Sequence, residues 1–196
     1  ILSKLNIKYL MVGDDFKFGK ERSGDFDFLS DWGSNNQIEV DRIPTHSFEG
    51  RRVSSTWIRE SIADGNFDLA AKLLDRRYTF SGKVVFGNKV GRTIGVPTAN
   101  IWVPKSNLPI KGVYAVKALV KGETFNGIAN MGVRPTVGGT SPVLEIHIFD
   151  FNEEIYGCRI EVEFYQKIRN EKKFENLDKL KEQINLDIAE TRKYFS

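Results

Sequence analysis

One stretch of the chain reads Arg159-Ile160-Glu161-Val162-Glu163-Phe164, and its apolar residues alternate strictly with polar ones. Such alternation is typical of a strand with one buried face. Four earlier segments are also rich in β-forming residues and bounded by glycine, proline or asparagine: residues 78–86, 113–120, 123–131 and 143–149. After the capping candidate Asn176, apolar residues recur at helical spacing at Leu177, Leu180, Ile184 and Ile188. The pattern predicts a small closed antiparallel β-barrel with a C-terminal helix packed on the sheet.

Residues 1–76 differ, because short apolar runs alternate there with helical patterns, as they do in α/β folds. Two strands and two helices are expected, at residues 7–12 and 37–42 and at residues 57–62 and about 67–74. Ser54-Ser55-Thr56 and Asn66 are the capping candidates for the two helices. The chain is therefore expected to be α+β overall, with an α/β domain over residues 1–76 and the barrel domain over residues 77–196.

The composition is that of an ordinary globular protein, with 40% hydrophobic and 28% charged residues in a chain of 196. No apolar run approaches the roughly 18 residues that a membrane span needs, so no membrane partner is expected. The single Cys158 allows no internal disulfide, which favours the cytoplasm. Basic and acidic residues are interspersed at a net charge of +3, without the basic stripe of a nucleic-acid-binding domain. The opening Ile1 and the lack of a signal-peptide pattern indicate a chain cut from a longer one.

Residues 82–95 hold four glycines and three basic side chains. Glycines let backbone N–H groups approach phosphate oxygens closely, and neighbouring cations supply positive charge. The segment is not a P-loop, since Gly87 is followed by Asn88-Lys89 instead of Lys-Ser or Lys-Thr. It is either a phosphate-binding loop or a glycine-rich hairpin of the barrel.

The next segment is Pro97-Thr98-Ala99-Asn100. Pro97 fixes the local backbone, and in an extended chain Thr98 and Asn100 point to the same side. A hydroxyl and an amide are weak neutral metal ligands. They suit Mg²⁺, because that ion keeps several waters and takes part of its coordination from substrate phosphates. The alternative interpretation is a simple turn.

The ordered motifs from residue 87 onward resemble the riboflavin kinase family, in which a glycine-rich loop leads into Pro-Thr-Ala-Asn. The later blocks follow in the family's order: Gly112-Val113-Tyr114, Asn130-Met131-Gly132-Val133-Arg134-Pro135-Thr136, Glu145-Ile146-His147, Asp150-Phe151, Ile155-Tyr156-Gly157 and Arg169-x-Glu171-Lys172-x-Phe174. A single block is weak evidence, whereas the set covers about residues 78–192.

The resemblance implies a riboflavin-kinase-like barrel that phosphorylates riboflavin to FMN with ATP and Mg²⁺ or another divalent metal, so that flavin is substrate and product. It places the general base at Glu145 and the metal ligands at Thr98 and Asn100. The phosphate loop maps to Gly87, Lys89, Gly91, Arg92 and Gly95. The flavin pocket maps to Asn130, Arg134, Thr136, Arg169, Glu171 and Phe174.

Glu145 lies in a segment whose alternation keeps it out of the core. Leu144, Ile146 and Ile148 share one face of the expected strand, and Glu145 and His147 share the other. Glu145 can therefore line a cleft, although without the resemblance it is an ordinary solvated strand residue. His147 is expected to be structural, because the chemistry already has its base.

Residues 1–76 resemble part of the Rossmann-like nucleotidyltransferase domain of bacterial FAD synthetases. Residues 12–25 look like the segment that follows a central strand in that domain. The run Ser54-Ser55-Thr56-x-x-Arg59 looks like the motif whose hydroxyls and arginine hold nucleotide phosphates at a helix N-terminus. Without the family, the Ser-Ser-Thr run is a helix cap. Together the halves resemble the bacterial bifunctional enzymes that make FMN and then adenylylate it to FAD.

That family's His-x-Gly-His motif is not present, because the two histidines are His46 and His147 and neither lies in it. We therefore expect the amino-terminal third to be missing and the chain to make FMN but not FAD. One alternative is an FAD synthetase fragment whose barrel only binds flavin, but Glu145 and the Pro-Thr-Ala-Asn segment argue against it. Another is a non-enzymatic barrel that binds nucleic acid, but its strand aromatics are not grouped with basic residues. Riboflavin and ATP are thus the expected partners, and residues 169–173 are either part of the flavin pocket or a solvated charge run.

Overall fold

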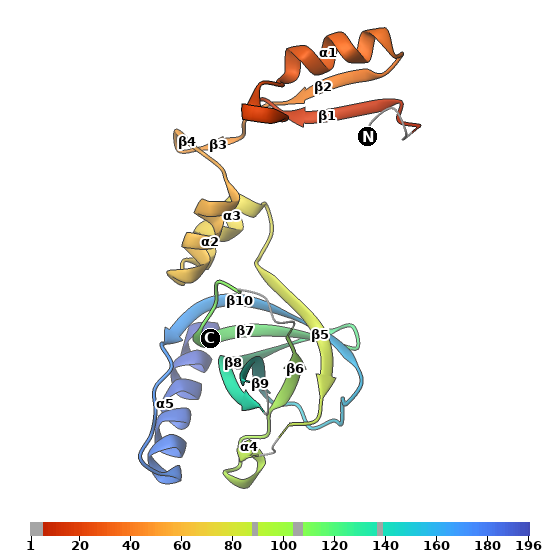
Figure 1. Cartoon of the computed structure of the whole chain (residues 1–196). Coiled ribbons are helices and arrows are strands. Elements are labelled where there is room, and N and C mark those ends of the chain that lie inside the picture. Colours follow the sequence, from red (N-terminus) through yellow and green to blue (C-terminus); the bar gives the residue numbers. More distant parts are fainter. Residues whose placement is uncertain (1–5, 88–89, 104–107, 137–138) are drawn as a thin grey trace. The chain divides into compact units, whose positions relative to one another are not determined.

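The computed structural model describes residues 6–87, 90–103, 108–136 and 139–196. The chain folds into two compact units, residues 1–54 and residues 55–196 (Figure 1). Among the described residues, no helix combines the length and the apolar character needed to cross a membrane.

The first unit is a βαβ arrangement. Its elements are β1 (Tyr9–Gly13), a 3₁₀ turn (Lys20–Arg22), α1 (Phe26–Asn35), β2 (Glu39–Ile43), β3 (Ser47–Phe48) and β4 (Arg51–Arg52). β1 and β2 pair in parallel, and α1 connects them. The Asp25 side chain caps α1 by accepting a hydrogen bond from the Phe28 amide at 3.1 Å. The two strands expected in this region are confirmed with ends shifted by one or two residues, whereas α1 was not predicted.

The second unit begins with two helices and continues as a closed barrel (Figure 1). Its elements are α2 (Ser55–Ala63), α3 (Phe67–Leu74), β5 (Thr79–Val85), α4 (Val90–Thr93), β6 (Ala99–Trp102), β7 (Gly112–Val120), β8 (Glu123–Thr136), β9 (Gly139–Ile148), β10 (Arg159–Arg169) and α5 (Leu177–Phe195). The strands run in the order β10-β5-β6-β9-β8-β7 around the barrel, and every neighbouring pair is antiparallel. The predicted α+β fold with a closed antiparallel barrel and a C-terminal helix is confirmed.

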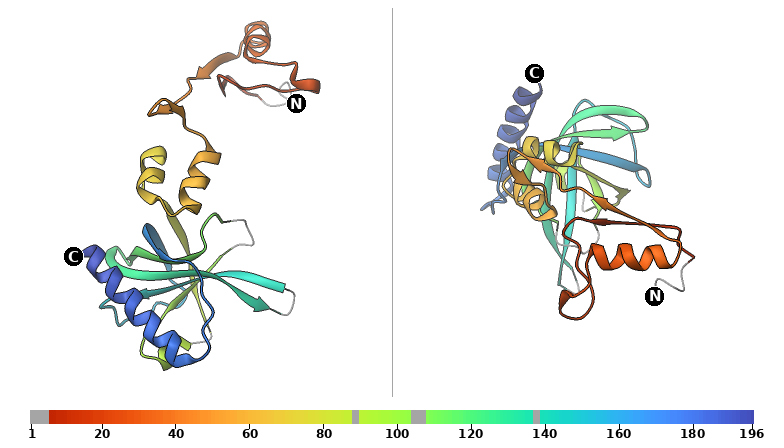
Figure 2. Two further views of the ribbon diagram at one scale, coloured as in Figure 1. Left: turned by 90° about the vertical axis from the view of Figure 1, so that its left-hand side faces the viewer. Right: turned by 90° about the horizontal axis from the view of Figure 1, so that it is seen from above.

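α2 and α3 cover one end of the barrel, and α4 lies at the other end (Figure 2). Phe67 is 1% exposed, and its ring stacks on Phe164 at 5.7 Å and meets Tyr114 edge-on at 5.6 Å. This packing places both helices in the barrel's compact unit, which begins at Ser55. The sequence pattern instead sets the domain boundary between residues 76 and 77, and that assignment stays a prediction.

Successive residues of a barrel strand face the barrel core and the outer surface in turn. On β9, Leu144 and Ile146 are fully buried in the barrel core. Glu145 and His147 point the other way and line a cavity on the outer face. The alternation read from the sequence is therefore confirmed for this strand.

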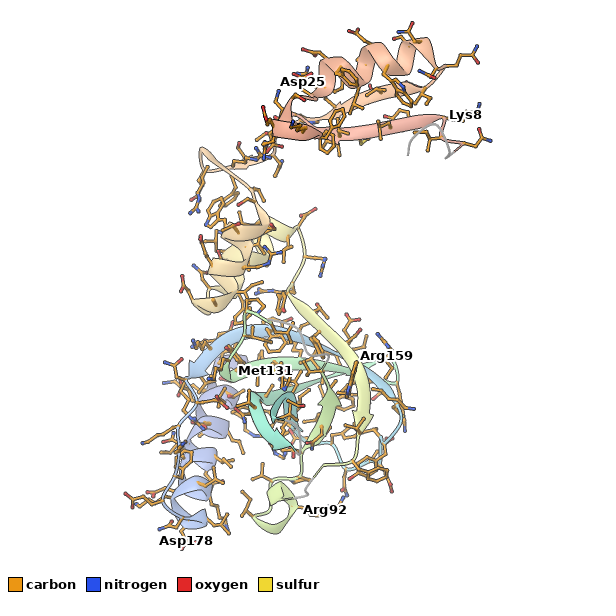
Figure 3. The ribbon with its side chains drawn as sticks, viewed as in Figure 1. Lys8, Asp25, Arg92, Met131, Arg159 and Asp178 are labelled. Carbon is orange, nitrogen blue, oxygen red and sulfur yellow. The ribbon has the colours of Figure 1, made fainter. Side chains whose placement is uncertain are left out.

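α5 runs along the outer face of the barrel, where it packs against β7, β8 and β10 (Figure 2). Asn176 caps the helix as predicted, because its side chain accepts a hydrogen bond from the Lys179 amide at 2.9 Å. Asp178 lies in the first turn, far along the barrel from the chain's C-terminal residues (Figure 3). The helix thus covers one side of the barrel.

The apolar stripe of α5 packs on the sheet only near its C-terminal part. Ile188 packs on a small apolar cluster of the outer face that contains Val113, Ile128 and Phe149. Leu180 and Ile184 instead line the cavity between α5 and the barrel, and Leu177 is exposed.

Candidate active site

A row of side chains crosses the outer face of the barrel at matched register. Asn100 on β6 pairs with Glu145 on β9, and Glu145 pairs with Asn130 on β8. Asn130 pairs with Val113 on β7, which pairs with Arg169 on β10. Because residues directly opposite on neighbouring strands share a face, these side chains form one line across five adjacent strands.

A cavity of about 350 Å³ lies over this row, beneath α5. Its volume is within the range of roughly 300–1,000 Å³ found for small-molecule sites. The predicted site residues that line it are Gly91, Thr98, Asn100, Asn130, Glu145, Arg169, Glu171 and Phe174. Its apolar walls come from Ile94, Val96, Val113, Ile128, Leu180 and Ile184. The cavity therefore suits a largely apolar ligand with polar groups at its rim.

Two glycines let the predicted phosphate loop lie against its neighbours. A β-carbon at Gly87 would collide with the side-chain amide of Asn100, which is only 4% exposed. A β-carbon at Gly91 would collide with the Val96 carbonyl oxygen. Each glycine thus permits an approach that no other residue allows. The phosphate-binding role of the loop stays a prediction.

A second cavity, of about 270 Å³, adjoins the first at Thr98, which lines both. Arg92 and Pro97 line this second cavity, together with Glu153 and Tyr156 from the segment after β9. Arg92 lies in α4 and is exposed (Figure 3). The two cavities give the site two compartments with Thr98 at their border.

The residues around Thr98 carry oxygen donors of the kind that a hard divalent cation prefers. Thr98, Asn100 and Glu145 line the same cavity, and their side chains offer a hydroxyl, an amide and a carboxylate. Oxygen donors of this kind suit Mg²⁺, which fills its remaining positions with water and substrate phosphates. Among the described residues, no group of three or more His, Cys, Asp or Glu side chains is arranged to hold a metal by itself. The donor set thus fits a metal that arrives with a nucleotide.

Arg169 is held by a carboxylate that the sequence interpretation did not include. Its Nε and Nη2 donate to Asp187 of α5 at 2.9 and 2.8 Å, and its Nη1 donates to the Asn170 carbonyl at 3.0 Å. Asp187 is 3% exposed and also accepts from Gln183 Nε2 at 2.9 Å. The guanidinium lies 5.6 Å from the centre of the Phe174 ring. This partly buried pair, with Arg169 21% and Asp187 4% exposed in their side chains, ties α5 to β10 at one wall of the cavity.

Glu171 is packed rather than simply solvated. Its side chain is 32% exposed and pairs with Lys111 Nζ at 3.5 Å, and a β-carbon at Gly132 would collide with its carboxylate. The Lys111 backbone is itself held by Tyr114, whose hydroxyl donates to the carbonyl and accepts from the amide, both at 2.8 Å. Burial raises the pKa of Tyr114, so this hydroxyl keeps its proton. The predicted segment 169–174 is therefore anchored against the barrel.

The other residues predicted for the site either do not line the first cavity or lie outside the described part of the chain. Gly95 takes the left-handed conformation (φ 82°) in the turn after α4. Lys89 lies outside the described residues. Arg134 and Thr136 belong to β8, opposite Ser141 and Gly139, and their side chains are not among those described.

His147 sits beside the row and makes a specific contact. Its Nδ1 donates to the Pro97 carbonyl oxygen at 2.8 Å. The ring also lines the first cavity, two residues from Glu145 on the same strand face. The expectation of a structural role for His147 is thus compatible with a position inside the site.

Comparisons with known proteins agree with this arrangement. A family model described as riboflavin kinase matches residues 74–195, which include the whole barrel. The chain belongs to the riboflavin kinase family. A second model, described as FAD synthetase, matches residues 1–57.

The riboflavin kinase domain and the preceding unit are matched together by longer relatives. The bifunctional riboflavin kinase/FMN adenylyltransferase of Haemophilus influenzae is 47% identical over 100% of this chain and 64% of the relative. The Escherichia coli protein of the same name is 44% identical over 100% of this chain and 63% of the relative. The chain thus spans less than two thirds of the length of these curated relatives. A crystal structure titled as a macrolide-efflux protein from Streptococcus pneumoniae shares the fold, with a TM-score of 0.78 and 35% identity over 97% of this chain and 62% of that one.

Proposed function

We propose that this chain transfers the terminal phosphoryl group of ATP to the primary alcohol of riboflavin, giving FMN and ADP. The observation that carries the proposal is the position of Glu145, which lies between Asn100 and Asn130 in one cross-strand row that faces the cavity. Phosphoryl transfer to an alcohol needs such a base beside the groups that hold the phosphates.

Glu145 accepts the proton of the attacking hydroxyl. The hydroxyl oxygen then bonds to the γ-phosphorus while the bond from that phosphorus to the bridging oxygen of ADP breaks. Thr98 and Asn100 would hold a divalent metal, which supplies neutralisation of charge on the phosphates when bound. The backbone of the loop around Gly91 and the side chain of Arg92 supply further donors for the phosphates.

The two cavities suggest how the substrates divide the site. The first has apolar walls and the Phe174 ring, with the Arg169 guanidinium 5.6 Å from its centre, which suit the flat flavin ring. The second is lined by Arg92 next to the glycine-rich loop, which suits the nucleotide. Thr98 borders both cavities, and this supports transfer of the phosphoryl group at that border.

The test is to incubate the chain with ATP, MgCl₂ and riboflavin and to follow FMN and ADP by chromatography. We expect equal amounts of FMN and ADP, and no FMN when EDTA removes the metal. Binding of riboflavin without any FMN would overturn the kinase proposal and favour the barrel that only binds flavin. Single-stranded RNA or DNA should neither bind nor change the rate. We also place the reaction in the cytoplasm, on the ground of the unpaired Cys158.

A second activity is proposed for the whole protein, namely adenylylation of FMN to FAD. The parallel βαβ unit supports it, together with the FAD synthetase match over residues 1–57. Assayed by itself, the 196-residue chain should convert riboflavin to FMN but not FMN to FAD, because neither of its histidines lies in a His-x-Gly-His motif. FAD formation at a rate comparable to that of FMN would contradict this expectation.

A further inference from the structure

The pairing of β6 with β9 includes Asn100 but stops before Thr98, the other proposed metal ligand. Its last partners in the direction of Pro97 are Ala99 and Ile146. Pro97 has no amide hydrogen, so the ladder of backbone hydrogen bonds cannot continue through it. His147 makes the next connection with its side chain, because Nδ1 donates to the Pro97 carbonyl oxygen at 2.8 Å. A carbonyl oxygen only accepts, so Nδ1 carries the hydrogen in this contact.

This hydrogen bond links the two parts of the site that must act together. The Pro97 carbonyl belongs to the peptide bond with Thr98, which borders both cavities. On the other side, His147 is two residues from Glu145 and shares its face of β9. The contact therefore sets the position of the segment that carries Thr98 against the strand that carries the proposed base.

The imidazole is itself held in place by neighbours from the outer face. Its ring meets Phe149 edge-on at 5.6 Å, and Phe149 is 3% exposed within the apolar cluster beneath α5. The Arg192 guanidinium of α5 lies 4.4 Å from the centre of the Phe149 ring and pairs with Asp150 through two contacts of 3.0 Å. These contacts limit the rotamers of His147, so its donor points in a fixed direction.

We propose that His147 is a positioning residue that holds Thr98 in place for a metal–nucleotide complex through the Pro97 carbonyl. The inference rests on the proposed kinase function and adds a residue to it. His147 acts through Pro97 and Thr98, so its loss should weaken the gain that a divalent metal gives to nucleotide binding. The His147 ring also lines the first cavity, but its hydrogen bond reaches Pro97, which lines the second, so riboflavin affinity should change less than nucleotide affinity.

The test uses variants that separate the hydrogen bond from the packing. His147→Asn keeps an N–H near the position of Nδ1, whereas His147→Leu keeps bulk and removes the donor. His147→Gln has a donor but places it farther along the side chain, near the position of Nε2. His46→Leu alters the other histidine, which is exposed in the first unit, and serves as the matched control.

Calorimetry of ADP binding with and without Mg²⁺ is the main measurement, and it does not depend on turnover. We expect the Mg²⁺-dependent gain in ADP affinity to fall about three- to tenfold in the Leu and Gln variants, as for one lost hydrogen bond. It should stay within about twofold of the parent protein in the Asn variant and in the His46→Leu control. In the Leu and Gln variants the KM for MgATP should rise by more than the KM for riboflavin, and riboflavin affinity should change less than the metal-dependent gain in ADP affinity.

Two outcomes overturn the inference. One is a normal metal-dependent gain in His147→Leu, and the other is an equal loss in the Asn and Leu variants, which would assign the effect to packing. If the Leu variant fails to fold, the comparison of Asn with Gln decides in the same way. If the parent protein makes no FMN but the calorimetric pattern holds, the proposed kinase function fails while the role of His147 in nucleotide binding stands.

Discussion

The two faces of β9 differ in what their residues do, although those residues alternate along the chain. Leu144 and Ile146 are 0% exposed and fill the barrel interior. Glu145 lies between them, yet it faces the cavity under α5 and the polar row of the neighbouring strands. Because strand side chains point alternately to two sides, one strand serves both the core and the site. Stability and chemistry should therefore respond to different substitutions at adjacent positions.

The largest effect is expected from Glu145→Gln on the outer face. The change keeps the shape of the side chain and removes the base, so turnover should fall by a factor of about 10²–10⁴. The temperature of unfolding and the affinity for riboflavin should stay near those of the parent chain. Steady-state FMN formation and thermal unfolding check the two halves. An unchanged turnover number would show that Glu145 is not the general base.

Leu144→Ala is the matching change on the inner face. It leaves a cavity at a fully buried site, so the free energy of unfolding should fall by about 2–5 kcal/mol. The turnover number of the folded fraction should not change, because the side chain faces away from the site. Urea unfolding measures the free energy of unfolding. The rate of FMN formation, divided by the number of active sites from a titration, gives the turnover number of the folded fraction. A large loss of turnover with normal stability would show that the two faces are not separable.

Thr98→Val and Asn100→Ala sharpen the comparison within the outer face. Each removes an oxygen proposed to hold the metal, so the KM for MgATP should rise about tenfold, or ~1.4 kcal/mol. The affinity for riboflavin should change much less. Thr124→Val, at an exposed position of β8, is the matched control for the first variant. If Asn100→Ala weakens only riboflavin binding, Asn100 belongs to the flavin cavity instead.

The smallest effect is expected from Tyr165→Phe, which lies outside the cavity. Burial, followed by the hydrogen bond that the hydroxyl donates to Glu163 at 2.9 Å, raises the pKa of Tyr165 to about 12 from 10.0. Between these values the unfolded chain has lost a proton that the folded chain retains. This contribution to stability is therefore full below pH 10 and is lost as the pH rises through about 12. Unfolding of the Phe variant should depend less on pH in that window, and its FMN turnover should be normal. An unchanged slope would mean that Tyr165 does not retain its proton.

The strands were predictable where one face is buried and the other is not. The alternation in residues 143–148 and 159–164 gave both the strands and their buried faces, which the structure confirms. The sequence does not distinguish β6 from a turn, because Pro97 lies two residues before it and it has only four residues. The sequence does not indicate α1, because Gly33, two serines and an asparagine weaken its helical pattern, although Asp25 is a suitable cap.

The site was predictable only in part from the chain. The order of the motifs indicated that Glu145, Thr98 and Asn100 are site residues. Their roles stay predictions. Asp187 was missed, although it lies three residues after Ile184 and so interrupts the apolar face of α5. A charged residue within an apolar helical face was the available signal. Its partner Arg169 is on another element, and sequence spacing alone does not bring the two together.

The strand order of the barrel also has a consequence for the order of events during folding. β7, β8 and β9 are consecutive hairpins, so Asn130 and Glu145 can meet through local contacts early in folding. Asn100 and Arg169 join them only when β6 pairs with β9 and β10 pairs with β7, which closes long loops of chain. A refolding chain should therefore regain its β-sheet signal before its ability to make FMN. The return of activity should therefore report the closure of the ring of strands.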